Sequence, residues 1–242
     1  MSTSIQISTI QWPCELSDEF KYDLLKCAKR RTLFEQNDSN PSYNRPKGLV
    51  YILAGAACFY FLDKNSRTIF GGLISPRDWA GAAGMKGGYN HAPGIWMRPI
   101  QPLDCLFIGF DDVERLSQSH LEMYKFLYFA NQEIQYKWGQ VQLMLNHNKQ
   151  QRVAYALIEL LALQKSYIDT YPRIPISQHD LGLACGLSRP RVNQVLQEFV
   201  RAGFISLERK YIGIVDQSRL EAEIDDVELI FTDPRKRLRK LD

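Results

Sequence analysis

The chain has 242 residues, of which 45% are hydrophobic, 12% aromatic and 24% charged, as in an ordinary folded protein of one or two domains. Its 30 basic and 27 acidic residues give a formal net charge of +3. This balance excludes a polybasic arm and an acidic-tail protein, so any binding of nucleic acid must come from local charge.

Membrane and secretory segments are not expected. The longest apolar run, Gly48 to Leu62, is shorter than the roughly 20 residues of a spanning helix, and it predicts two buried strands joined near Gly55. The N-terminus lacks a basic start followed by an apolar core, so we expect no signal peptide and a cytoplasmic location. Five scattered cysteines without a CxxC pair favour free thiols over a disulfide framework or a zinc site.

Residues 15–30 predict a short amphipathic helix with Ser17 as its N-cap. From Leu33 to Ile108, short β-prone runs alternate with stretches rich in Gly, Pro and Asn, which predicts a small sandwich or barrel. The predicted strands lie in the runs LVYIL, CFYFL, RTIFGGLI, GIWMRPI and CLFIGF.

A long helix is predicted from Asp111 to about Leu145, because Asp111 and Glu114 form a capping pattern and no proline follows. Apolar positions recur at steps of three and four residues, close to a heptad. A helix of about 35 residues is roughly 50 Å long, which favours a parallel dimer seam over packing across the chain's own β domain. The predicted seam residues are Leu116, Met123, Leu127, Ile134, Trp138, Val141 and Leu145.

A second helix is predicted over residues 149–164, followed by the pattern of two short helices joined by a tight turn. Ser177 begins the first of these helices, and Gly186 stands where the turn is expected. Ser188 can cap the next helix, whose first turn accommodates Pro190.

The last of these helices separates apolar from polar residues. At about 100° per residue, one side carries Val192, Val195, Leu196 and Phe199. The other side and its flanks carry Pro190, Arg191, Asn193, Gln194, Gln197 and Arg201. Such a row suits a reader of the DNA major groove, because Arg pairs with guanine and Gln or Asn pairs with adenine. A solvated polar face is the alternative.

The stretch AGFISLERKYIGIVD then predicts two strands joined by a turn that carries Arg209 and Lys210. Two helices followed by a two-stranded wing form a winged helix, and basic residues at the wing tip can contact phosphates. The predicted DNA-binding residues are Ser177, Ser188, Arg189, Arg191, Asn193, Gln194, Arg209 and Lys210.

The segment SQHDLGLACGLSRPRVNQVLQEFVRAGFIS resembles the DNA-binding signature of the CRP/FNR family of bacterial transcription regulators. The resemblance is carried by Asp180, Leu181, Ala184, Gly186, Leu187, Ser188, Arg189, Val192, Leu196, Gly203 and Ile205. It implies an α+β fold with a cyclic-nucleotide-binding-like β-roll of jelly-roll type, a long dimerisation helix and a winged helix-turn-helix. The implied parts are residues 1–110, 111–146 and 147–225, with a charged tail over 226–242. Gly55 and the run Ser75 to Gly81 look like β-roll turns of this family.

The family's DNA contacts match this chain unevenly. Ser177 matches a phosphate-contacting position, and Arg189 matches an arginine that reads guanine. Pro190 stands in place of the usual glutamate, and Gln194 stands in place of a second arginine. The resemblance therefore implies a half-site that differs from the common family sequence, with adenine favoured by Gln194.

The sensor departs further from the family. Cyclic-nucleotide members hold the ribose with a Gly-Glu pair and the phosphate with an Arg-Ser pair. The matching positions here are Gly81-Ala82 and His91-Ala92, so the resemblance implies no cAMP binding of the usual kind. Cys14 and Cys27 alone cannot hold an iron–sulfur cluster.

No cofactor or metal is predicted, and the effector is unknown. Haem stays open through His91, His120 or a cysteine, although a lone histidine is more often a hydrogen-bonded surface or core residue. The aromatic residues Trp79, Tyr89 and Trp96 are compatible with a small ligand and equally with plain β-roll core.

We therefore expect a homodimeric, sequence-specific DNA-binding transcription regulator and not an enzyme, with double-stranded DNA, a second copy and RNA polymerase as partners and no membrane. One alternative is a cupin-type metal-dependent enzyme, for which clustered His ligands are lacking. Another is a structural protein that binds DNA without sequence preference. The basic end PRKRLRKLD contacts phosphates, folds back on the acidic segment before it, or forms a solvated disordered end.

Overall fold

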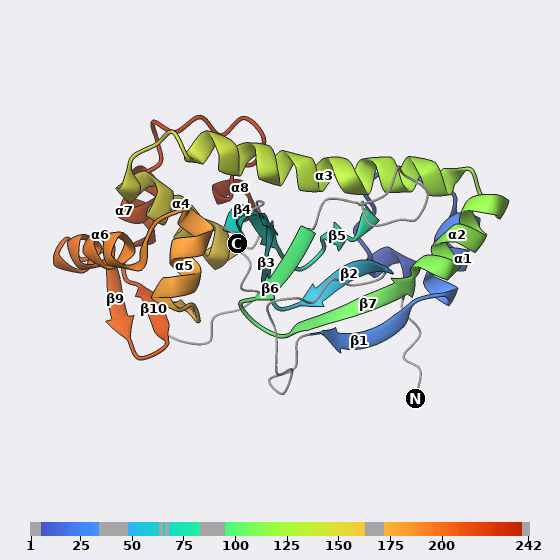
Figure 1. Ribbon diagram of the computed structural model, residues 1–242, viewed down its shortest axis with the longest axis horizontal. Coiled ribbons are helices and arrows are strands. Elements are labelled where there is room, and N and C mark those ends of the chain that lie inside the picture. Colours follow the sequence, from blue (N-terminus) through green and yellow to red (C-terminus); the bar gives the residue numbers. More distant parts are fainter. Residues whose placement is uncertain are drawn as a thin grey trace. The chain divides into compact units, whose positions relative to one another are not determined.

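The computed structural model describes residues 6–33, 48–62, 65, 68–82, 95–162 and 172–238. The chain divides into two compact units. The first unit comprises Met1–Leu62 and Leu73–Gln135, and the second comprises Asp63–Gly72 and Tyr136–Asp242. Most N-terminal strands belong to the first unit, and the helix-turn-helix region belongs to the second (Figure 1).

Two sheets form the N-terminal β region. The first has the order β1-β7-β2-β5, made of Lys29–Leu33, Leu103–Gly109, Gly48–Ala54 and Trp79–Ala80. The second has the order β4-β3-β6, made of Thr68–Ile74, Ala57–Leu62 and Ile95–Pro99. All five predicted runs are strands, so the predicted α+β fold with an N-terminal β region is confirmed. Strands β1 and β5 were not predicted.

Glycines are required at two turns of this region. Gly55, between β2 and β3, has φ +88°, and a Cβ atom there would lie 2.1 Å from the carbonyl oxygen of Pro102. Gly81, after β5, has φ +93°, and a Cβ atom there would lie 2.2 Å from the carbonyl oxygen of Gly48. Both positions combine a left-handed backbone with a close approach of another strand, which only glycine tolerates. The predicted turn near Gly55 is confirmed.

The core of the first unit centres on Trp79. Its ring lies 4.8 Å from that of Tyr51 and 4.9 Å from that of Phe126, measured between centroids. The indole nitrogen of Trp79 donates to the backbone oxygen of Gln11 at 3.0 Å, which satisfies its polar group inside the core. Trp79 is therefore a core residue, whereas Tyr89 and the side chain of Trp96 lie outside the described residues.

The N-terminal helix forms as predicted. It follows a short 3-10 helix, η1 (Ile7–Thr9), and helix α1 spans Asp18–Lys26. The hydroxyl of Ser17 accepts a hydrogen bond from the backbone nitrogen of Phe20 at 3.2 Å. Ser17 is thus the N-cap, and it satisfies a donor that the first turn leaves without a helical partner.

The predicted single long helix is two helices. Helix α2 spans Phe110–Ser119, helix α3 spans Glu122–Met144, and His120 between them has an extended backbone, with φ −129° and ψ 110°. The His120 ring lies 3.2 Å from the carboxylate of Asp23 on α1. Contacts with α1 therefore accompany the break, and the long helix begins at Glu122 rather than Asp111.

The predicted dimer seam needs a second correction. Leu116 and Met123 lie in the same core as Trp79, and Leu127 packs against it. Ile134 packs against the neighbouring core around Phe59, and Val141 is also buried. Because a buried side chain cannot meet a second chain, Leu116, Met123 and Val141 do not form a seam. Trp138 and Leu145 are 44% and 42% exposed.

In the second unit, α5 (Gln178–Cys185) and α6 (Arg189–Arg201) form the helix-turn-helix, and α4 (Lys149–Ala162) packs against both helices. A three-stranded sheet of order β8-β10-β9 follows, made of Arg173–Ile174, Tyr211–Ile214 and Ile205–Glu208. Helices α7 (Gln217–Ala222) and α8 (Arg235–Leu238) complete it. The two helices and the two-stranded wing are confirmed, and β8 adds a third strand. Among the described residues, no helix is long and apolar enough to span a bilayer.

Candidate nucleic-acid interface

The turn between α5 and α6 is shaped by a cap and two glycines. The Ser177 hydroxyl accepts from the backbone nitrogen of Asp180 at 3.1 Å and so begins α5. Gly186 ends α5 in the left-handed conformation, with φ 59° and ψ 37°. A Cβ atom on Gly182 would lie 2.8 Å from the carbonyl oxygen of Leu187, so the backbone of the turn approaches α5 more closely there than an alanine allows. The predicted cap and turn are confirmed.

Arg152 on α4 holds this turn from outside. Its Nε donates to the carbonyl oxygen of Cys185 at 2.8 Å, and its guanidinium also donates to the carbonyl of Gly186 at 2.8 Å. These carbonyls end α5 and have no helical partner, so a cation is favourable beside them. Burial lowers the pKa of Arg152 from its ordinary value, and the neighbouring Arg191 lowers it further. Arg152 was not singled out in the sequence, because nothing in a helical pattern reveals a distant backbone partner.

Helix α6 begins at Arg189, with Pro190 in its first turn as predicted. Ser188 has the extended backbone of an N-cap, with φ −70° and ψ 150°, but its side chain makes no capping hydrogen bond. The prediction that the Ser188 hydroxyl caps α6 is therefore wrong. Ser188 is exposed directly before the start of α6.

The two sides of α6 divide as the sequence predicts. Val192, Val195, Leu196 and Phe199 are each 2% exposed or less. The predicted readers Arg189, Arg191, Asn193 and Gln194 are all exposed. Helix α6 is thus anchored by its apolar side and presents a polar side to solvent, which is the geometry of a groove-reading helix.

Two of the predicted readers are held by intrachain hydrogen bonds. Gln178 donates to the amide oxygen of Asn193 at 3.2 Å, and Gln194 donates to the carboxylate of Glu198 at 3.1 Å. Glu198 also faces Lys149 at 3.5 Å, so its negative charge is balanced by α4. Arg189 and Arg191 therefore carry the positive charge at the beginning of this side of α6, and Arg201 carries it at the end. If Asn193 or Gln194 bound a base edge, its amide would exchange an intrachain hydrogen bond for one to the base, so no free amide would have to be desolvated.

The wing carries the remaining predicted contacts. Arg209 and Lys210 are exposed in the turn between β9 and β10, and Lys210 has φ +76°. A non-glycine residue at this φ is uncommon, so the turn is tight. Glu208 pairs with Arg173 of β8 at 3.3 Å, which leaves the charge of the wing tip to the two basic residues.

The N-terminal β region offers fewer described groups. Gly81 is explained by its approach to β2, and His91 and Ala92 lie outside the described residues. Burial raises the pKa of Cys105 to about 11 and that of Cys185 to about 12, so both thiols stay protonated at neutral pH. Within the described ranges, no group of three or more His, Cys, Asp or Glu side chains is placed to hold a metal ion.

Comparison with known proteins agrees with this geometry. The family model of the Crp-like helix-turn-helix domain matches residues 151–223. No curated protein matches the chain by sequence. Among solved structures, FixK2 from Bradyrhizobium japonicum is 18% identical with a TM-score of 0.59, over 80% of this chain and 92% of that one.

Two further structures are similar over most of their length. TTHB099, a transcriptional regulator of the CRP family from Thermus thermophilus, is 17% identical with a TM-score of 0.57, over 81% of this chain and 94% of that one. The c-di-GMP responsive global regulator CLP from Xanthomonas campestris is 15% identical with a TM-score of 0.61, over 82% and 99%. At such identities the likeness lies in the fold. Residues 151–223 are thus a Crp-like helix-turn-helix domain, and the chain as a whole has the fold of the CRP/FNR transcriptional regulators.

Proposed function

We propose that this chain is a sequence-specific DNA-binding transcription regulator that acts as a homodimer on a two-fold symmetric site. Helix α6 carries the proposal, because its arginines and amides are exposed on one side while its other side is buried. Because α6 is the second helix of a Crp-like helix-turn-helix domain, we expect its exposed side to bind in the DNA major groove.

The residues of the face suggest how it reads DNA. Arg189 suits a bidentate contact with guanine, and the amide of Gln194 suits adenine. Pro190 has no group that can accept from cytosine, so we expect a half-site unlike the common one of the family. We expect four groups to contact phosphates. They are the hydroxyls of Ser177 and Ser188 and the wing residues Arg209 and Lys210.

A row of exposed side chains along α3 supports the homodimer. Its large apolar members are Tyr124, Tyr128 and Trp138 on α3, with Leu121 directly before the helix and Leu145 directly after it, and their exposed fractions range from 42% to 85%. Their spacings of 3, 4, 10 and 7 residues all fit the alternating three- and four-residue steps of a heptad. We propose this exposed row of α3 as the seam, in place of the row that is buried in the chain's own core.

The sensor is proposed to respond to a signal other than cAMP of the usual kind. Ala82 stands where a ribose-binding glutamate is needed, and Gly81 has a packing role against β2. An effector would act by changing how the two α3 helices pack, and hence the spacing of the recognition helices. RNA polymerase is the expected further partner, and we expect the protein to act in the cytoplasm.

Selection of duplexes from a random-sequence library, followed by gel shift on the selected site, tests the proposal. Each bidentate base contact contributes about 1–3 kcal/mol, so the R189A/R191A double variant should bind the selected site at least about tenfold more weakly. The K21A/K26A double variant removes the same charge from α1, and it should bind like the native protein.

Two outcomes would contradict the proposal. Equal sequence-specific binding by the native protein and the R189A/R191A variant would show that α6 does not read the site. Equal and strongly salt-dependent affinity for selected and random DNA would instead favour a non-specific DNA-binding protein. Metal analysis of the purified protein separately tests the cupin-type alternative, which needs a bound metal ion.

A further inference from the structure

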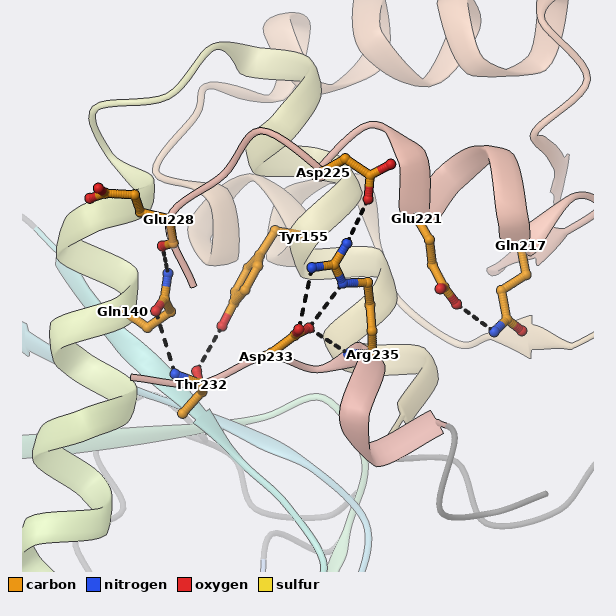
Figure 2. Close-up of polar contacts among 9 residues, drawn as sticks. All are labelled: Gln140, Tyr155, Gln217, Glu221, Asp225, Glu228, Thr232, Asp233 and Arg235. Carbon is orange, nitrogen blue, oxygen red and sulfur yellow. Dashed lines mark hydrogen bonds and ion pairs between the residues drawn. The ribbon is translucent and has the colours of Figure 1, made fainter. Parts of the chain in front are cut away.

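The chain continues beyond the matched domain into a C-terminal arm, defined here as Glu223–Leu238. Figure 2 shows the polar contacts of this arm with two helices of the second unit. Ile224, Val227 and Leu238 are less than 10% exposed, so the arm is anchored by buried side chains near both of its ends. Packing of this extent calls for a role beyond that of a solvated chain end.

One end of the contact is Gln140 on α3, whose side chain is fully buried. Its amide nitrogen donates to the backbone oxygen of Glu228 at 2.9 Å. Its amide oxygen accepts from the backbone nitrogens of Phe231 at 3.1 Å and Thr232 at 3.4 Å. A single buried side chain thus satisfies three backbone groups of the arm, each of which would be costly to bury without a partner. Figure 2 shows two of these contacts, those with Glu228 and Thr232.

Two residues of α3 near Gln140 also contact the Phe231 ring of the arm. A Cβ atom on Gly139 would lie 3.0 Å from a ring carbon of Phe231, so the missing side chain makes room for that ring. The Phe231 ring stacks on Tyr136 with 5.9 Å between centroids and 22° between planes. These contacts fix the arm on the last turns of α3.

The other end of the contact is α4. The hydroxyl of Tyr155, which is 4% exposed, lies 3.1 Å from the hydroxyl of Thr232 (Figure 2). Thr232 therefore bonds to α3 through its backbone nitrogen and to α4 through its side chain. Arg235 closes the arm on itself through Asp225 at 2.7 Å and Asp233 at 3.1 Å, and α8 packs against α4.

Only residues 145–148 link α3 covalently to α4. The exposed row of α3 is the proposed dimer seam, and α4 holds the helix-turn-helix through Arg152. A tie between α3 and α4 therefore affects how far apart a dimer presents its two copies of α6.

We propose that the C-terminal arm is a brace that fixes the angle between α3 and α4, with Gln140 and Thr232 as positioning residues. The brace restricts the dimer to one separation of its recognition helices, and hence to one spacing of half-sites on DNA. The proposal rests on the homodimeric DNA binding proposed above. It assigns to the arm a part in choosing the site, although the arm itself reads no base.

The test uses the full chain and two variants. Q140L removes three hydrogen bonds at a similar side-chain volume, and the milder T232V removes only the hydroxyl that contacts Tyr155. The matched control is Q217A, because Gln217 bonds to Glu221 within α7 and not to another helix. Affinities are measured on the selected site, on duplexes with one or two base pairs added or removed between half-sites, and on a single half-site.

We expect the native protein and Q217A to bind the selected spacing about tenfold or more tightly than altered spacings. For Q140L this preference should fall to about threefold or less, with an intermediate value for T232V and an unchanged affinity for the single half-site. Hydrogen exchange should show faster exchange at residues 228–232 in Q140L with native protection in α5 and α6, which separates release of the arm from unfolding.

The unfavourable outcomes are distinguishable. A native spacing preference in both variants overturns the brace and leaves the proposed function intact. An equal loss of affinity for every duplex, the single half-site included, also overturns it, because that pattern reflects general destabilisation. If the native protein selects no sequence, the proposed function fails, and the role of the arm in site choice fails with it.

Discussion

Arg152 holds the turn between α5 and α6 although it belongs to neither helix. Its guanidinium satisfies the carbonyls of Cys185 and Gly186, and Gly186 leaves room for it, since a Cβ atom there would lie 2.7 Å from the guanidinium. The orientation of α6 therefore depends on a partly buried cation of α4. A neutral side chain of similar length cannot replace it, because the carbonyls would be left without donors.

We predict that R152M destabilises the protein by about 1.5–3 kcal/mol, the usual contribution of hydrogen bonds to a charged group. Urea unfolding of R152M measures this loss, and gel shift on the selected site should show weaker binding because α6 is less firmly placed. The control R201M changes an exposed arginine of α6 whose Nε donates to the backbone oxygen of Gln197, in its own helix, at 3.3 Å. A stability change in R152M no larger than in R201M would contradict the role of Arg152.

The break before α3 is fixed by a contact between the starts of two helices. The carboxylate of Glu122 accepts from the backbone nitrogen of Ser17 at 2.8 Å and from its hydroxyl at 2.5 Å. Ser17 is at the same time the N-cap of α1. The two hydrogen bonds from Ser17 hold the pKa of Glu122 below its usual value of 4.5.

A carboxyl group with a lowered pKa stabilises the fold above its ordinary pKa, and this stabilisation is lost as the pH falls through the lower, folded value. We predict that E122Q is less stable than the native protein at pH 7 and that the difference shrinks as the pH falls below 4.5 and through the lower, folded pKa of Glu122. Thermal unfolding at pH 7 and pH 3 measures it, with E114Q on α2 as the control. A difference that persists unchanged at pH 3 would exclude the ionised Glu122 as its cause.

The elements that were predicted correctly are those whose own sequence carries the signal. The five apolar β-prone runs became strands, and α6 separated its faces at the helical period. Strand β1 was missed because its sequence, KRRTL, is mostly exposed at a sheet edge and shows no apolar alternation. The break at His120 was missed because Asp23, which contacts His120, and Ser17, which contacts Glu122, are both remote in the chain.

The same limit applies to the site. Arg189, Arg191 and Gln194 could be proposed from the sequence because an amphipathic helix shows its polar side in the residue pattern, and the structure leaves all three exposed. Arg152 and Gln140 could not, because both bind backbone groups of segments far along the chain. Side chains that position a site, rather than contact its ligand, depend on tertiary structure and leave no local pattern.

Helix α3 carries two rows of apolar residues, and its sequence does not say which row meets a second chain. Periodicity predicts that one side of a helix is buried, but it does not say whether that side packs against the same chain or against a partner chain. The structure separates the two, because Met123 and Phe126 are fully buried in the core while Tyr124 and Tyr128 are 58% and 64% exposed. Aromatic residues at this exposure are typical of the anchors of an interface.

We therefore predict that Y128D converts the dimer to a monomer, because a charged group at the centre of the seam would have to be desolvated on association. Truncation of a central aromatic anchor costs about 2 kcal/mol or more, so the dimer dissociation constant should rise at least about 30-fold. Sedimentation velocity over a range of concentrations measures this change. The control Y22D alters an aromatic residue of α1 that is 56% exposed and lies outside the row.

A native-like circular dichroism spectrum of Y128D would show that the variant is folded. A loss of the dimer could then be attributed to the interface and not to unfolding. The monomer should then bind a single half-site with native affinity and lose the additional affinity of the two-fold site, because each chain keeps its own α6. A Y128D protein that sediments as the native dimer would remove the exposed row of α3 from the interface. The half-site spacing would then have to be set by another surface of the chain.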